Sequence, residues 1–127
     1  MNDNDIYVVS AVRSAIGTFG GSLKDLPLAD LATQVSRAAI ERSGVAPEQI
    51  GHVVMGNVIP TEARDAYLGR VAAMNAGIPK ETPAFNVNRL CGSGLQAIVS
   101  AAQTLQLGEA EAVLAAGAEA MSRGPYL

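Results

Sequence analysis

Strand-like and helix-like segments alternate along the chain, and this alternation constrains the fold more than any other feature. Short apolar runs bounded by glycine, proline or polar residues predict strands at 5–13, 52–60, 82–90 and 111–120. Apolar residues spaced three and four apart predict helices over 28–43, 68–78 and 93–108. Because helices separate the strands, we expect an α/β fold in which helices cover a largely buried sheet.

The helix expected over 93–108 has the clearest pattern. Its larger apolar residues form one stripe, which consists of Leu95, Ile98, Val99, Ala102 and Leu105. Such a stripe is typical of an amphipathic helix.

The composition indicates that much of the surface is covered by other protein. Hydrophobic residues make up 49% of the 127 residues and charged residues only 17%, whereas soluble domains usually carry about a quarter charged residues. No run of about 18 apolar residues occurs, so we expect no membrane span. The excess is better explained by burial in a subunit interface or against the rest of a larger polypeptide.

The net charge and the single cysteine limit which partners and which cellular compartment we expect. The net charge is −3 and the basic residues are scattered, which argues against binding to nucleic acid. The acidic start, MNDNDIYVVS, lacks the basic and apolar regions of a secretory leader, so we expect none. One cysteine cannot form an internal disulfide, so we expect a cytoplasmic protein.

Two features that could suggest a ligand site are weak. The glycine-rich GTFGG at 17–21 matches neither the dinucleotide-binding nor the phosphate-binding loop, and it is interpreted as a tight turn. His52 is the only histidine. With one cysteine about 39 residues away it makes a poor zinc site, so we expect a structural role for it and no bound metal.

Cys91 has a setting that favours chemistry. It follows an expected strand, and Gly92, Ser93 and Gly94 then open an expected helix. The free N–H groups of a first helical turn favour a thiolate or a developing oxyanion nearby, and glycines leave room for a substrate. Free cysteines are also often merely buried. The residues alone therefore leave a nucleophilic and a structural interpretation open.

The residues around Cys91 resemble the acylation site of thiolases. In NRLCGSGLQAIVSAAQ the family pattern Asn-x-x-Cys precedes a small-residue turn and an alanine-rich helix. AVRSAIGTFGGSLKD, GNVIPTEARDAYLGRVAAMNAGIP and AGAEAMSRGPYL are similar to further thiolase stretches, in the family order. The resemblance covers nearly the whole chain. It is closest to bacterial acetyl-CoA acetyltransferases and β-ketothiolases of the biosynthetic type, which also feed polyhydroxyalkanoate production.

This resemblance implies a fold and a reaction. The fold would be the N-terminal half of a layered α-β-α architecture, with a mixed sheet and a buried helix after the nucleophile. Cys91 would take the acyl group from an acyl-CoA, and a Claisen condensation with acetyl-CoA or the reverse thiolysis would follow. The Cys91 N–H would donate to the oxyanion, and Asn88, Gly92, Ser93 and Gly94 would support the turn. Coenzyme A thioesters are implied as substrates, with no metal or redox cofactor.

Other thiolase motifs are missing from these residues. The family histidine in Gly-His-Pro, the second cysteine in Cys-x-Gly-Gly-Gly and the asparagine in Asn-Glu-Ala-Phe do not occur. Residues 1–127 would thus be most of the N-terminal domain without the C-terminal catalytic domain, as a fragment, a nicked product or one part of a split enzyme. We expect no turnover by this chain alone. The implied partners are the remaining thiolase polypeptide and further copies, in a dimer of dimers.

Two other functions stay open on the residues. A ketoacyl synthase or a related condensing enzyme also places a cysteine on a strand-to-helix turn, although GTFGG, GNV and MSRGPY favour a thiolase. A thiolase-like fragment without catalytic activity could instead act only by binding a partner chain.

Overall fold

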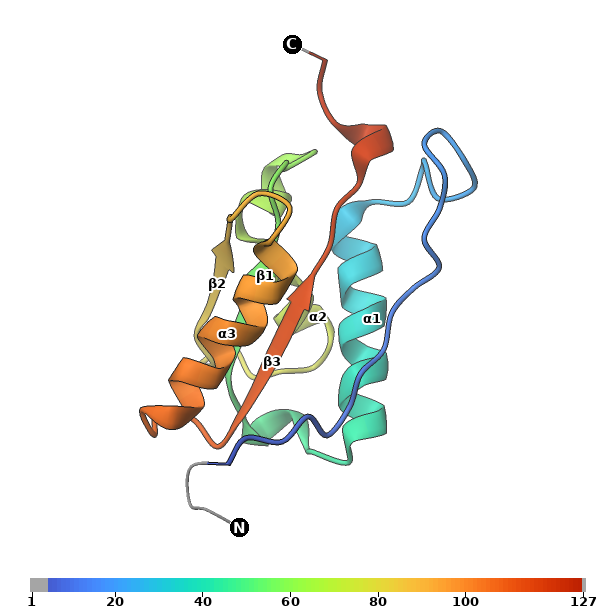
Figure 1. Ribbon diagram of the computed structural model, residues 1–127. Helices are drawn as coiled ribbons and strands as arrows, with labels where there is room; N and C mark the ends of the chain where they lie inside the picture. Colours follow the sequence, from blue (N-terminus) through green and yellow to red (C-terminus); the bar gives the residue numbers. More distant parts are fainter. Residues whose placement is uncertain (1–4, 127) are drawn as a thin grey trace.

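A computed structural model describes residues 5–126 (Figure 1). Residues 1–4, part of the stretch from which we expect no secretory leader, and residue 127 lie outside the described residues. The main elements are, in order, α1 (Leu28–Ser43), β1 (Ile50–Gly56), α2 (Leu68–Asn75), β2 (Ala84–Val87), α3 (Ser93–Gln106) and β3 (Ala112–Gly117). Short 3-10 turns occupy Pro47–Gln49, Ala63–Tyr67 and Met121–Arg123. Six of the seven predicted elements are therefore confirmed, with boundaries moved by a few residues.

The described strands form one sheet in the order β2-β1-β3. Both pairings are parallel, so the expected mixed sheet is not found among residues 5–126. The strands share one direction because a helix carries the chain back across the sheet between successive strands. The central strand β1 is the most deeply buried, and Val53, Val54 and Met55 have no exposed surface.

Helices cover both faces of this sheet, which confirms the layered α-β-α architecture (Figure 1). On one face α1 and α2 pack against Met55, with Leu28 and Leu68 fully buried between them. On the other face α3 packs against Val54 through Ala97 and Ala101. The alternation of side chains along β1 sends Val54 and Met55 to opposite faces.

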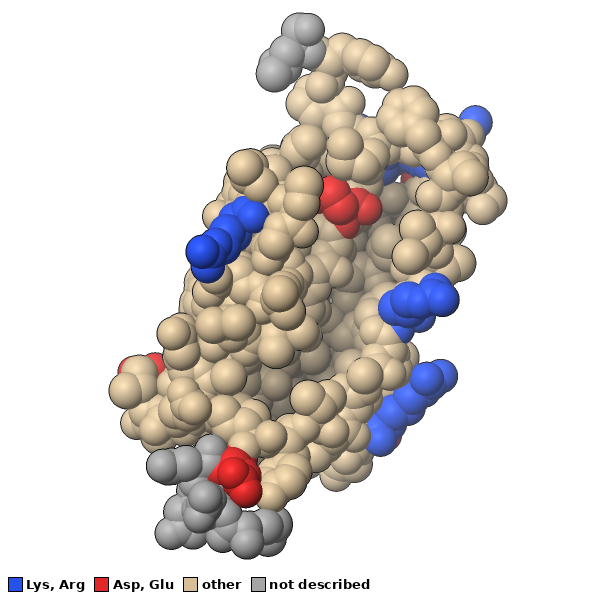
Figure 2. Space-filling view, viewed as in Figure 1, with Lys and Arg blue, Asp and Glu red and all other residues tan. Residues whose placement is uncertain are grey.

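The strand predicted at 5–13 is wrong. Residues 5–13 are extended but belong to no strand within the described part of the chain, and Val8 and Val9 are 80% and 63% exposed. The segment runs beside α1, and an apolar groove of about 1070 Å³, lined by 6–19, α1, α3 and β3, lies between it and the sheet. Figure 2 shows this hollow, lined mostly by uncharged residues. A strand needs a neighbouring strand to pair with, and residues 6–13 pair with no strand among the described residues.

Most of the apolar stripe of α3 is exposed within residues 5–126. Leu95, Ile98 and Val99 are 70%, 52% and 44% exposed. The buried residues of α3 are smaller: Ser93, Ala97, Ala101 and Thr104. Small side chains allow the helix to lie close to the sheet, and the bulky residues then face away. Within residues 5–126, α3 is thus buried on one face only.

The GTFGG segment forms the predicted tight turn. Gly20 has φ 69°, in the left-handed region that favours glycine. The N–H of Gly21 donates to the carbonyl of Thr18 at 2.9 Å, and the N–H of Gly20 donates to Ser122 Oγ, also at 2.9 Å. The turn is therefore packed against the segment that follows β3.

Candidate active site

Cys91 lies in the short connection between β2 and α3, at the end of the sheet toward which the parallel strands run. Its thiol is free and exposed. Gly92 is the N-cap residue of α3, and no described side chain caps the helix. The N–H groups of Gly92 and Ser93 donate to the carbonyls of Arg89 and Leu90, both at 3.1 Å. The positive end of the α3 dipole still lies next to Cys91, where it favours negative charge. Ligands of parallel α/β sheets bind at this same end.

The backbone turns sharply at Leu90, immediately before Cys91. Leu90 has φ 51°, the only positive φ of a non-glycine residue among residues 5–126. This left-handed conformation costs roughly 1–2 kcal/mol for a residue with a side chain. Gly92, which directly follows Cys91, has φ −89° and is not in the left-handed region. The sharp turn precedes Cys91 instead of following it.

Asn88 and Ser93 hold this turn with their side chains. Asn88 Oδ1 accepts from the N–H of Leu90 at 2.9 Å. Ser93 Oγ accepts from the N–H of Arg89 at 2.8 Å and donates to the carbonyl of Leu90 at 2.6 Å. Ser93 itself is buried, so the two hydrogen bonds of its hydroxyl are partly shielded from water. The structure thus brings two of the predicted support residues to the turn before Cys91.

Gly92 and Gly94 leave open space beside Cys91. Both are exposed. A Cβ added at Gly94 would have no atom of another element within 4 Å, and one at Gly92 would lie 3.4 Å from the Arg89 carbonyl oxygen. Neither glycine is required by close packing against another element. Their missing side chains instead leave the approach to Cys91 open.

We expect Ser93→Ala to destabilise the chain by about 1–3 kcal/mol, because it leaves the Arg89 N–H without its acceptor and removes one of the two hydrogen bonds to the Leu90 carbonyl, which still accepts from the Ser93 N–H. Urea denaturation measures this loss. Ser100→Ala is the matched control in the same helix, since the Ser100 hydroxyl accepts a single bond from Gln96 Nε2 at 3.1 Å. An equal loss in both variants would contradict the role of Ser93 in holding the turn.

His52 is not near Cys91. It lies in the first half of β1, about 13 Å along the strand from Gly56 at its end. Its ring packs edge-on against Phe85, with the ring centroids 5.4 Å apart. This packing supports the structural interpretation of His52. In the described part of the chain, no group of three or more His, Cys, Asp or Glu residues could hold a metal ion.

Sequence reasoning missed Glu119, which holds the backbone after β1. Its carboxylate accepts from the N–H groups of Val58 at 2.8 Å and Ile59 at 3.2 Å, and from Asn57 Nδ2 at 2.9 Å. A usable signal was present, because GNV and AGAE lie toward the ends of two expected strands, and the carboxyl ends of parallel strands meet at one edge of a sheet. Glu119 fixes the loop that borders the same end of the sheet as Cys91.

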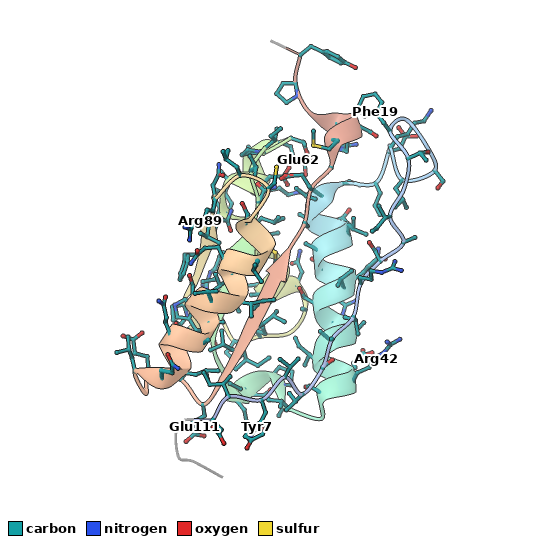
Figure 3. All side chains as sticks on the ribbon, viewed as in Figure 1. Tyr7, Phe19, Arg42, Glu62, Arg89 and Glu111 are labelled. Carbon is teal, nitrogen blue, oxygen red and sulfur yellow. The ribbon has the colours of Figure 1, made fainter. Side chains whose placement is uncertain are left out.

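A network of ion pairs links the loop after β1, the start of α1 and the segment after β3. Arg64 Nε donates to Glu62 Oε1, and this hydrogen bond raises the pKa of the Arg64 guanidinium above its ordinary value. Arg64 also lies 3.4 Å from Asp30 at the start of α1, and Arg123 lies 3.6 Å from Glu62. Figure 3 shows Glu62 at the same end of the molecule as Arg89, and Tyr7 and Glu111 at the opposite end.

An exposed cysteine at a strand-to-helix turn is a feature that this chain shares with a known family. The model of the thiolase N-terminal domain matches residues 6–127. The chain belongs to the thiolase family. Thiolase relatives match over nearly its whole length: beta-ketothiolase BktB of Cupriavidus necator is 61% identical over 123 residues, and the mitochondrial 3-ketoacyl-CoA thiolase of Homo sapiens is 46% identical over 121.

Solved thiolase structures share the fold. The crystal structure of human mitochondrial 3-ketoacyl-CoA thiolase superposes with a TM-score of 0.92 at 45% identity, over 95% of this chain and 31% of that one. The acetyl-CoA acetyltransferase of Bacillus anthracis gives a TM-score of 0.89 at 44% identity, over 94% of this chain and 30% of that one. The thiolase resemblance and the fold class are thereby confirmed.

The alignments cover nearly all of this chain but less than a third of each relative. It covers 97% of this chain but 31% of beta-ketothiolase BktB, and 95% of this chain but 30% of the human mitochondrial thiolase. The chain thus spans about a third of the thiolases that it matches. Among its described helices, none has the length and apolar character needed to cross a bilayer.

Proposed function

We propose that this chain carries the acyl-accepting step of a thiolase reaction. The observation that carries the proposal is the exposed thiol of Cys91 beside the uncapped first turn of α3. The Cys91 thiolate attacks the thioester carbon of an acyl-CoA and forms a new C–S bond. The C–S bond to coenzyme A breaks, and coenzyme A leaves as a thiolate that takes up a proton. The backbone N–H of Cys91 donates to the carbonyl oxygen while that oxygen carries negative charge.

The second step needs more polypeptide. Condensation of the acyl group with a deprotonated acetyl-CoA, or thiolysis in reverse, needs a base, and the only histidine of the chain lies well away from Cys91. Relatives about three times longer support a partner that supplies this machinery. The apolar groove beside β3 and the exposed stripe of α3 are surfaces that such a partner would cover. We propose the remaining thiolase polypeptide as that partner, with coenzyme A thioesters as substrates and no cofactor.

Finer features of the function are proposals as well. Similarity to a protein named beta-ketothiolase supports the biosynthetic type, which serves polyhydroxyalkanoate or fatty acid metabolism. A cytoplasmic location and assembly as a dimer of dimers remain predictions from the sequence. The division into a nearly complete N-terminal domain at 1–127 and a separate C-terminal catalytic domain also remains a prediction.

Incubation with acetyl donors tests the function. We expect acetyl-CoA to leave one acetyl group on Cys91, detected by mass spectrometry of the intact chain and of its peptides. The acetyl thioester of an acyl carrier protein should react far more slowly. The reverse preference would favour a ketoacyl synthase, and no adduct from either donor would favour a partner-binding fragment. Cleavage of acetoacetyl-CoA by the purified chain would contradict the proposed need for further polypeptide.

A further inference from the structure

Two glycines lie side by side at the carboxyl ends of neighbouring strands. Gly56 ends β1 and Gly117 ends β3, and the two are paired in the parallel register of the sheet. Neither has a positive φ among the described glycines. Their backbone conformations therefore suit any residue, and another cause must be sought for glycine at both positions.

That cause is the first turn of α3, which lies directly on the two glycines. A Cβ at Gly56 would lie 2.7 Å from the carbonyl carbon and oxygen of Ser93 and 2.9 Å from the nitrogen of Gly94. A Cβ at Gly117 would lie 3.3 Å from the Cα of Gly94. All these neighbours are atoms of the Ser93–Gly94 backbone. A rotamer change therefore cannot relieve the contact, and the turn itself would have to move.

We propose that Gly56 and Gly117 are positioning residues for Cys91. They form a seat that sets how deeply the start of α3 sinks onto the sheet, and so fix the position and direction of the Cys91 backbone N–H relative to the strand ends, where the thioester would bind. This inference rests on the proposed acyl transfer, in which that N–H stabilises the oxyanion. The Leu90 turn holds the residues before Cys91 through Asn88 and Ser93, and the two-glycine seat holds the residues after it.

The steric distances predict a graded effect. To restore ordinary contact, Gly56→Ala would push the first turn of α3 outward by about 1 Å, and Gly117→Ala by only a few tenths of an ångström. Donors of an oxyanion site act over narrow distances, and a displacement of about 1 Å can cost up to a hundredfold in rate. Attack on a small alkylating agent needs no oxyanion donor. Displacing the first turn of α3 should therefore slow the reaction of Cys91 with thioesters much more than its alkylation.

The test compares two reactions of Cys91 in the 127-residue chain. The rate of acetylation by acetyl-CoA is divided by the rate of alkylation by iodoacetamide, for the wild type, Gly56→Ala and Gly117→Ala. We expect this ratio to fall roughly tenfold or more in Gly56→Ala and about two- to fivefold in Gly117→Ala. A ratio unchanged in both variants, or a larger fall in Gly117→Ala, overturns the proposal.

Gly51→Ala is the matched control. Gly51 lies in the same strand at its other end, and a Cβ there would lie 2.8 Å from the Cβ of Ala110. It should destabilise the chain without changing the ratio, and an equal fall in Gly51→Ala contradicts a specific seat. If Gly56→Ala does not fold, the ratio measured for the milder Gly117→Ala variant tests the proposal.

Amide chemical shifts separate the seat from the proposed function. In ¹⁵N spectra, Gly117→Ala, and Gly56→Ala where it folds, should shift the signals of residues 91–95, and Gly51→Ala should not. If the wild-type chain takes no acetyl group, the proposed function fails. The amide shifts alone then test whether Gly56 and Gly117 position the first turn of α3. Unmoved signals of residues 91–95 in the seat variants then overturn it.

Discussion

Cys91→Ser is expected to abolish acetylation of the chain by acetyl-CoA and to leave the fold intact. A serine hydroxyl without a nearby general base is a far weaker nucleophile than a thiolate. The Cys91 side chain is exposed, so the substitution should change stability by no more than about 0.5 kcal/mol. Peptide mass spectrometry measures the adduct and urea denaturation the stability. An equal adduct on the Cys91→Ser chain would remove Cys91 from the mechanism.

A relocated thiol provides the sharper control for this result. Because Cys91 is the only cysteine, Ala15→Cys in the Cys91→Ser background gives a chain with one thiol elsewhere. Ala15 is exposed in the loop before α1, without a helix start beside it. We expect this thiol to be alkylated readily but acetylated much more slowly than Cys91. Equal acetylation would mean that the turn before α3 contributes nothing to acyl transfer.

Leu68→Ala is expected to cost about 2–5 kcal/mol of unfolding free energy, the usual range for truncating a buried leucine. Leu68 is fully buried at the start of α2, where it packs with Leu28 and Met55 between the helices and the sheet. Alanine would leave a cavity in this layer. Urea denaturation, with the slope checked for an unchanged unfolding transition, measures the loss.

Leu95→Ala is the matched control for the packing of the two helices. Leu95 belongs to the apolar stripe of α3, but it is 70% exposed. We therefore expect a change of no more than about 0.5 kcal/mol. If Leu95→Ala costs as much as Leu68→Ala, the stripe of α3 is covered in this chain and the described packing is contradicted.

Most of the secondary structure could be predicted because it depends on local spacing. The ends of α1 agree with the prediction to the residue, and the two other helices end within three residues of their predicted ends. The segment 5–13 could not be placed correctly, because its apolar, β-branched pattern shows only that it can be a strand. Whether it is one depends on a hydrogen-bonding neighbour from elsewhere in the sequence.

Some residues of the candidate site could also be predicted from local sequence, and one could not. Cys91 could be identified from its sequence neighbours, since a cysteine before Gly-Ser-Gly and a helical pattern is a local arrangement. The thiolase pattern also implied a supporting role for Asn88 and Ser93, which lie within three residues of Cys91. Glu119 was missed, since it contacts a loop about 60 positions earlier in the chain.

By itself, then, the sequence determined the order of the elements, the cysteine at the strand-to-helix turn and the thiolase family. Only the tertiary structure decided which face of α3 is buried and where the sharp turn falls. It also decided that Gly56 and Gly117 lie beneath the nucleophile. The reason is physical: spacing along the chain sets local conformation, whereas burial and close approach depend on contacts between segments that only folding brings together.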